Sequence, residues 1–126
     1  MILEACIENI TYLKEVVNAG AKRIELCDNL AVGGTTVSVG VRDYAKYFCD
    51  SNNVELAVMI RARGGNFVYN NIEKAVMYND LKDMAKQGVP PDQIVDCFSD
   101  RAPRTVIRRI LRDMKNTSST VNLEDL

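Results

Sequence analysis

The hydrophobic pattern of the chain changes its period several times, and each change predicts a new element. Three short apolar runs predict strands: residues 1–7, 21–28 and 54–60. Three stretches with apolar residues at helical spacing predict helices: residues 9–19, 40–51 and 71–87. Strands that alternate with helices in this way predict a parallel sheet with right-handed crossovers, which is an α/β fold.

The pattern is less regular after Gly88. Residues 93–98 fit either a fourth strand or a short helix, and residues 102–115 predict a strongly basic helix, followed by a polar linker and a frayed acidic tail. In one interpretation these residues are a fourth β/α unit, and the chain is half a barrel with open sheet edges. In another, residues 71–115 form three helices, and the basic third helix lies in a DNA groove.

Composition narrows the class of protein. A chain of 126 residues with 47% hydrophobic and 26% charged residues is predicted to form a single domain over residues 1–126. Its net charge of −1 gives no global attraction to nucleic acid or anionic membrane. Because no apolar run approaches about 20 residues and the N-terminus enters a strand at once, we expect a cytoplasmic protein without a membrane partner.

The cysteine and histidine content limits the chemistry. The four cysteines contain no CxxC pair, so neither a zinc ribbon nor a disulfide framework is indicated. The sequence has no histidine, which excludes histidine-dependent triads. Carboxylates, lysine, tyrosine and cysteine remain as candidates for acid–base chemistry.

Functional residue types gather where the predicted strands end, which is where parallel α/β folds bind ligands. Glu25 and Cys27 are two residues apart and therefore share one face of a strand, and Glu4 with Cys6 repeats the pattern. Met59 follows the same alternation at the end of the third strand. Two thiolates and a thioether are soft ligands that suit Cu(I), so Cys6, Cys27 and Met59 are the predicted metal ligands.

The same strand ends also allow an enzyme that acts on a small anionic metabolite. Glu25 would be the acid or base, with Arg61 beside it. Arginines and the backbone N–H groups of glycine turns bind phosphate or carboxylate. The residues predicted to bind that anion are Arg63, Gly33, Gly34, Thr35, Gly64 and Gly65. Inert packing is the other interpretation of the cysteines, because free cysteine is commonly a small buried hydrophobe.

A series of motifs resembles the CutC copper homeostasis family over about residues 2–88. The motifs are Glu4-Ala5-Cys6, Ala19-Gly20-Ala21-Lys22-Arg23-Ile24-Glu25-Leu26-Cys27, Gly33-Gly34-Thr35-Thr36 and Met59-Ile60-Arg61-Ala62-Arg63-Gly64-Gly65-Asn66-Phe67. The resemblance implies a TIM-like (β/α) barrel in the cytoplasm that handles copper. It also implies that the cysteines at positions 6 and 27 are the proposed copper ligands, and it leaves an enzymatic role open.

The chain departs from the family pattern at several places. Val37 and Ala62 replace prolines of the family, and Asn66 replaces an aspartate. An eight-stranded barrel needs about 200 residues or more, so we expect a partial TIM-type barrel over residues 1–88, with residues 89–126 diverged. The expected open edges predict a homo-oligomer. A diverged relative that has lost the family activity is the remaining interpretation.

Overall fold

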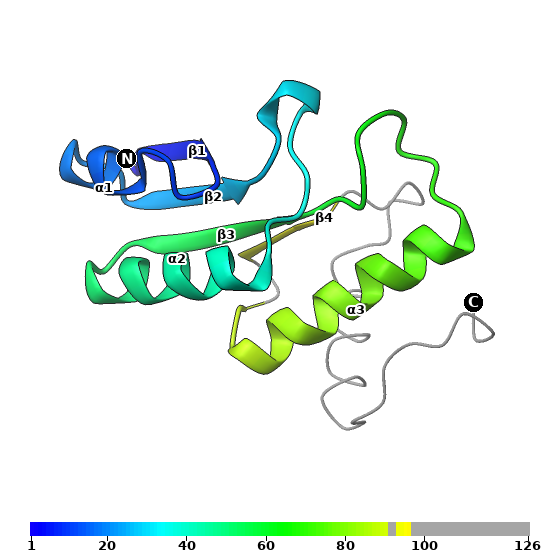
Figure 1. Ribbon diagram of the computed structural model, residues 1–126. Coiled ribbons are helices and arrows are strands. Elements are labelled where there is room, and N and C mark those ends of the chain that lie inside the picture. Colours follow the sequence, from blue (N-terminus) through cyan, green and yellow to red (C-terminus); the bar gives the residue numbers. More distant parts are fainter. Residues whose placement is uncertain (91–92, 97–126) are drawn as a thin grey trace. The chain divides into compact units, whose positions relative to one another are not determined.

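The structure, a computed structural model, describes residues 1–90 and 93–96. The chain divides into two compact units, Met1–Met59 and Ile60–Leu126. The elements in chain order are β1 (Glu4–Glu8), α1 (Leu13–Asn18), β2 (Arg23–Cys27), the 3-10 turn η1 (Leu30–Val32), α2 (Val39–Ser51), β3 (Glu55–Ile60), α3 (Asn71–Gln87) and β4 (Ile94–Asp96) (Figure 1). Strands alternate with helices, so the predicted α/β class is confirmed.

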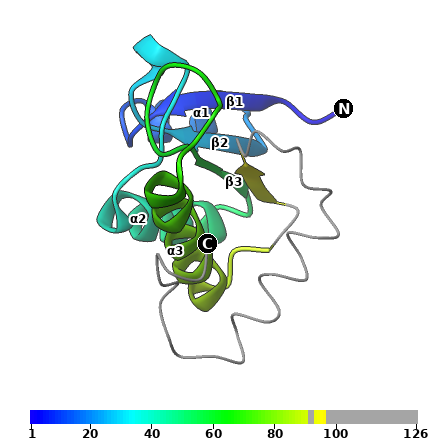
Figure 2. The same ribbon diagram turned by 90° about the vertical axis from the view of Figure 1, so that its right-hand side faces the viewer.

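The first unit is built on a parallel sheet in which β2 lies between β1 and β3 (Figure 2). In the register, Cys6 is the partner of Glu25, and Glu25 is in turn the partner of Ala57. Alternate residues of a strand point to opposite faces, and Ile24 and Leu26 are fully buried on the face opposite to Glu25. The sheet therefore has one apolar face and one face that carries polar and sulfur-containing side chains.

Local backbone signals explain where the helices begin and end. The predicted helix over residues 9–19 is shorter in the structure and begins at Leu13, because Asn9 and Tyr12 have positive φ angles of 56° and 64°, outside the helical region. The α2 helix begins one residue earlier than predicted, after Ser38, whose hydroxyl accepts the Val41 N–H at 3.2 Å.

The α3 helix has the predicted bounds. Asn70 and Glu73 form a reciprocal capping box at its start, in which each side chain accepts a backbone N–H of the other. Gly88 follows its last residue with a φ of 89°, a conformation that glycine adopts without steric cost. Both ends of the helix are thus set by residue types that favour helix ends and can be recognised in the sequence.

Of the two interpretations of residues 93–98, the strand is confirmed over Ile94–Asp96. This strand favours a fourth β unit over a helix at that point. Residues 97–98, the predicted basic helix over residues 102–115 and the acidic tail lie outside the described residues. The nucleic-acid interpretation that depends on that helix stays a prediction.

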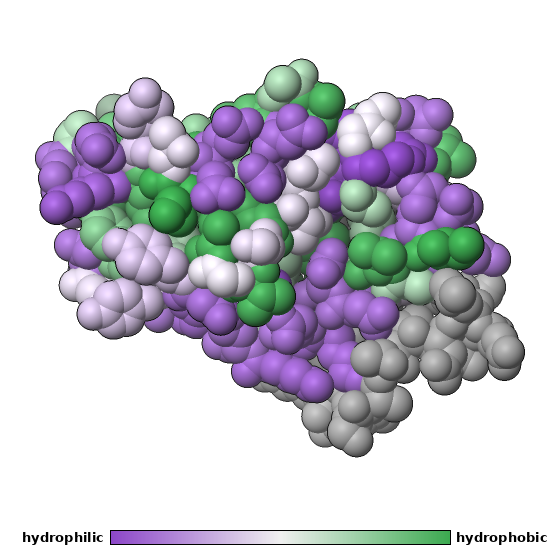
Figure 3. Space-filling view, in the orientation of Figure 1, coloured by the Kyte–Doolittle hydropathy of each residue, from purple (hydrophilic) through white to green (hydrophobic). Residues whose placement is uncertain are grey.

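Hydrophobic side chains lie in patches among hydrophilic ones on the face drawn in Figure 3. One surface feature of the first unit is an open groove of about 230 Å³. It is lined by Ile10, Tyr12, Leu13, Lys14, Glu15, Tyr44 and Phe48. Two of its rings, those of Tyr44 and Phe48, are stacked with centroids 6.3 Å apart. None of these lining residues contains sulfur, so the groove differs chemically from the sheet face that carries the cysteines.

Candidate metal centre

The polar face of the first unit is organised in cross-strand rows. Arg23 has Glu4 and Glu55 as its partners in the neighbouring strands, and its guanidinium lies 3.6 Å and 2.7 Å from their carboxylates. All three side chains are partly exposed, so this row contributes little to stability. It balances charge at the N-terminal ends of the strands. The next row, Cys6 and Glu25, begins the candidate site.

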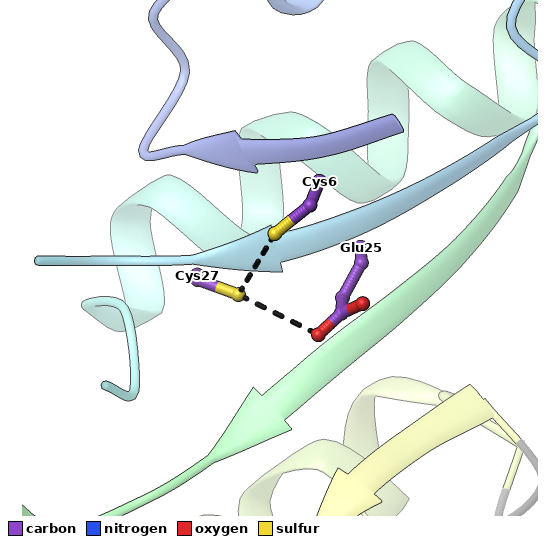
Figure 4. A group of neighbouring side chains, drawn as sticks. All are labelled: Cys6, Glu25 and Cys27. Carbon is purple, nitrogen blue, oxygen red and sulfur yellow. Dashed lines mark hydrogen bonds between the residues drawn. The ribbon is translucent and has the colours of Figure 1, made fainter. Parts of the chain in front are cut away.

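Two thiols and a carboxylate converge on this face (Figure 4). The Sγ atoms of Cys6 and Cys27 are 3.8 Å apart, and the Cys27 thiol lies 3.9 Å from Oε1 of Glu25. Cys27 is 0% exposed, whereas Cys6 is exposed to solvent. The site therefore has a buried thiol at its base and an accessible thiol at its entrance.

The surroundings keep both thiols protonated. Burial is the main cause that raises the pKa of Cys27 well above its usual range, and the adjacent Cys6 and the charge of Glu25 raise it further. Burial is also the main cause that raises the pKa of Cys6. The hydrogen bond with Cys27 opposes this rise, and the charges of Glu25 and Glu4 add to it. A metal that binds these sulfurs as thiolates would displace their protons.

The spacing fits a single metal ion. The ligand atoms of Cys6, Glu25 and Cys27 all lie within 4.8 Å of one another, and no other such group of cysteine, aspartate or glutamate occurs within residues 1–90 and 93–96. Metal–sulfur bonds of about 2.3 Å place two sulfurs about 3.8 Å apart at a tetrahedral angle and about 4.6 Å apart when they are opposed. The observed Sγ–Sγ distance falls at the lower end of this span.

Met59 lies beside this group. Continuing the register of β2 and β3 by one residue makes Met59 the cross-strand neighbour of Cys27, on the same face. Its side chain is 8% exposed. A Cβ placed on Gly34 would meet Met59 Sδ at 2.8 Å and Cys27 Cβ at 3.2 Å, so both side chains pack against the same point of the Gly34 backbone.

The residues of the first glycine turn use their N–H groups within the turn. Gly33 donates to the carbonyl of Leu30 at 2.9 Å, and Gly34 donates to that of Asn29 at 3.1 Å. Thr35 and Asp28 exchange two backbone hydrogen bonds of 2.8 and 2.9 Å. These bonds fix the turn directly after β2. The predicted anion site at this turn stays a prediction.

The second glycine turn belongs to the second unit and surrounds the two predicted arginines. Arg61 donates to the Gly65 carbonyl at 2.8 Å, and its guanidinium lies 4.8 Å from the centre of the Phe67 ring. Glu25 belongs to the first unit and Arg61 to the second, so the predicted pairing of Glu25 with Arg61 stays a prediction.

Arg63 is bound on several sides by its own loop. It donates to the carbonyls of Gly64, Asn66 and Val68 at 3.0, 2.7 and 2.7 Å, and it forms an ion pair with Glu73. Its guanidinium also lies over the ring of Tyr69, 5.0 Å from the centre. These contacts give Arg63 a structural role, and its predicted role in anion binding stays a prediction.

Two features of the site were not assigned from the sequence. Glu25 was predicted as an acid or base, and its carboxylate, within 4.8 Å of both thiols, also makes it a candidate metal ligand. The repeated Glu-x-Cys pattern was the signal for that placement. Gly34 was predicted to bind an anion, and its contact with Met59 and Cys27 had no signal in the sequence, because it depends on how the turn folds back over β3.

The fold and site define the chain as an α/β protein with a paired-thiol site on a parallel sheet. Comparison with known proteins then gives its relatives. The CutC family model matches residues 1–102, and the chain belongs to the CutC family. The resemblance derived from the motifs is thereby confirmed.

Individual relatives agree with this assignment. The CutC protein of Enterococcus faecalis is 50% identical over 88 residues, which are 70% of this chain and 42% of that protein. The human copper homeostasis protein cutC homolog is 40% identical over 81 residues, 64% of this chain and 29% of that protein. The crystal structure of the CutC protein from Streptococcus agalactiae matches with a TM-score of 0.72 and 39% identity, covering 92% of this chain and 56% of that one.

The chain thus spans less than half the length of the curated relatives that it matches. Within residues 1–90 and 93–96, none of the helices is both long and apolar enough to cross a membrane. The cytoplasmic location stays a prediction.

Proposed function

We propose that this chain binds Cu(I) through the thiolates of Cys6 and Cys27 and thereby takes part in copper homeostasis. The single observation that carries the proposal is the 3.8 Å between the two sulfurs, which lie on one face of neighbouring strands. Copper is the cargo here, held by side chains of the chain itself. Copper homeostasis is the role named for the human and Dictyostelium discoideum relatives.

The chemistry of the donors supports this metal. Thiolate and thioether sulfur are soft ligands that select Cu(I), whereas carboxylates and water suit harder ions such as Mg²⁺ or Ca²⁺. The site offers two thiols, the thioether of Met59 close by and only one carboxylate, that of Glu25. The exposed Cys6 would receive the ion, and the buried Cys27 would hold it away from solvent.

An anaerobic titration of Cu(I) against a competing chelator tests this function. We expect that combining Cys6→Ser with Cys27→Ser lowers the Cu(I) affinity by more than the roughly 10- to 100-fold that loss of an outer-shell partner costs. The matched control is Cys49→Ala, which removes a buried thiol of α2 that belongs to no such group. It should leave the affinity unchanged.

The opposite result has a clear meaning. If the double serine variant is folded by circular dichroism and binds Cu(I) as tightly as the unaltered chain, the thiols are not the ligands and the proposed function is wrong. A loss of affinity in Cys49→Ala of the same size would also contradict it, because the effect would then not be specific to the site.

A further inference from the structure

We propose that Gly34 is a positioning residue of the metal site: its missing side chain lets the Met59 thioether lie against Cys27 and act as the third sulfur ligand. This inference rests on the proposed function, because it concerns the same Cu(I) site. It reassigns Gly34 from the predicted anion site to the sulfur site.

The packing around Gly34 leaves no room for a side chain. Its φ of 97° lies in the left-handed region, which glycine occupies without steric cost. An added Cβ would stand 2.8 Å from Met59 Sδ and 3.2 Å from both Met59 Cε and Cys27 Cβ. The end of the methionine side chain is flexible and would be displaced first, whereas Cys27 is fixed in β2. A side chain at position 34 would therefore push Met59 away.

The turn that carries Gly34 is held in place by its own hydrogen bonds. Gly34 donates to the carbonyl of Asn29, and the next residue, Thr35, is paired with Asp28 directly after Cys27. The backbone of Gly34 is thus tied to the end of the strand that carries the buried thiol. This arrangement closes one side of the space in which the Met59 sulfur lies.

The consequence for binding is a site with sulfur from three neighbouring strands, Cys6 on β1, Cys27 on β2 and Met59 on β3. A neutral thioether adds a soft donor without adding charge, which favours a soft monovalent cation. Zinc sites in proteins draw on cysteine, histidine and carboxylate ligands, so a thioether contributes little to Zn²⁺. Gly34 and Met59 would therefore act on the choice of metal as well as on the affinity.

The test is a double-mutant cycle read by Cu(I) competition titration, with Zn²⁺ as the second metal. Met59→Leu keeps the volume and removes the sulfur, and such a swap is well tolerated in cores. We expect Gly34→Ala and Met59→Leu each to weaken Cu(I) binding by roughly 10- to 100-fold. The combined variant should lose no more than Met59→Leu alone, because Gly34 acts through the thioether. Zn²⁺ binding should change in neither single variant.

The matched control is Gly20→Ala, which imposes the same kind of backbone strain without the contact. Gly20 has a φ of 112°, and an added Cβ there would meet nothing within 4 Å. A second readout needs no metal: the ¹³C-methyl NMR signal of Met59 should move in Gly34→Ala and stay in place in Gly20→Ala. Met59→Leu keeps the test decisive even if Gly34→Ala fails to fold.

Several outcomes would overturn the inference. Unchanged Cu(I) affinity in Met59→Leu excludes the thioether as a ligand, and losses that add in the double variant mean that Gly34 does not act through Met59. Failure of the inference about Gly34 and Met59 can be distinguished from failure of the proposed function. If the paired serine variant loses Cu(I) and Met59→Leu does not, only the role of Gly34 and Met59 is wrong. If the serine variant keeps Cu(I), both are wrong.

Discussion

Cys6 and Cys27 bring their sulfurs to 3.8 Å from diagonal positions on neighbouring strands, since the register partner of Cys27 is Glu8 and that of Cys6 is Glu25. With strands about 4.8 Å apart and a rise of about 3.3 Å per residue, the two Cα atoms lie about 8 Å apart. A disulfide needs Cα atoms closer than about 7 Å. The pair is therefore spaced for a shared ion and too far apart for a disulfide without backbone movement.

We expect that oxidised glutathione does not join Cys6 to Cys27 in the folded chain. Mass spectrometry after differential alkylation should find both thiols free under native conditions, and a crosslink between them only after denaturation, when the strand register no longer separates them. A disulfide between them in the native chain would contradict this spacing. Mixed disulfide formation at the exposed Cys6 alone would be compatible with it.

The pH dependence of metal binding follows from the raised thiol pKa values. Cys6 and Cys27 are protonated at neutral pH, and in the proposed site they would bind metal as thiolates. Each proton that leaves with binding would then raise the apparent affinity about tenfold per pH unit below the thiol pKa. Cu(I) titrations at pH 6, 7 and 8 should therefore show affinity that rises with pH. An affinity that stays constant over this range would mean that binding does not displace the protons of the thiols.

Glu25 should add to the effect of burial in lowering the reactivity of Cys6, the exposed thiol of the site. Its charge raises the pKa of Cys6, so Glu25→Gln is expected to lower that pKa and make alkylation of Cys6 by iodoacetamide faster at pH 7 to 8. The matched control is Glu8→Gln. It neutralises a carboxylate on β1, the strand of Cys6, that is not among the causes of the raised pKa of Cys6. An unchanged alkylation rate in Glu25→Gln would remove Glu25 from the electrostatics of the site.

Arg63 offers a way to separate its structural role from anion binding. Arg63→Ala removes donors to three loop carbonyls and the partner of Glu73, and we expect it to lower the free energy of unfolding by about 1–3 kcal/mol. Arg63→Lys keeps the charge but lacks the planar fork, so it should be destabilising as well. Denaturation with and without phosphate provides the comparison. Stabilisation by phosphate that vanishes in Arg63→Ala would instead support the predicted anion site.

The edge of β1 leads to an expectation about assembly. Among the described residues β1 is paired on one side, with β2, and it is preceded by exposed Ile2 and Leu3. The Leu3 carbonyl and the Asn9 N–H both bond on the β2 side, so the alternation of the strand turns the backbone groups of Glu4, Cys6 and Glu8 to the other side. Such an edge can pair with a strand of another chain.

We therefore expect the homo-oligomer that the sequence predicts, with β1 at its interface. Light scattering over a range of concentrations should show assembly, and Ile2→Lys should weaken it by placing a charge beside the edge. Lys14→Glu changes a charge on α1 and is the control that should leave the assembly state unchanged. A monomer at every concentration would contradict the prediction.

Local chemistry allowed the elements to be predicted closely. The α3 helix is bounded by Asn70 and Gly88, whose capping roles are visible in the sequence, and β3 is an apolar run that ends at the arginines. The start of α1 was missed because the apolar spacing continues through Asn9 and Tyr12, where the backbone leaves the helical region. Periodicity records which residues are apolar and does not record such a change of φ.

The sequence by itself determined the alternation of strands and helices and the pairing of Glu25 with Cys27 on one face, because the side-chain period of a strand is fixed by covalent geometry. Only the tertiary structure decided that Cys6 reaches Cys27 diagonally and that Gly34 lies against Met59. Both depend on the register between strands and on the path of a turn, which arise from contacts between residues far apart in the chain. Distances of that kind are not encoded in any local pattern, so the sequence could suggest residues for a candidate metal site and could not give their spacing.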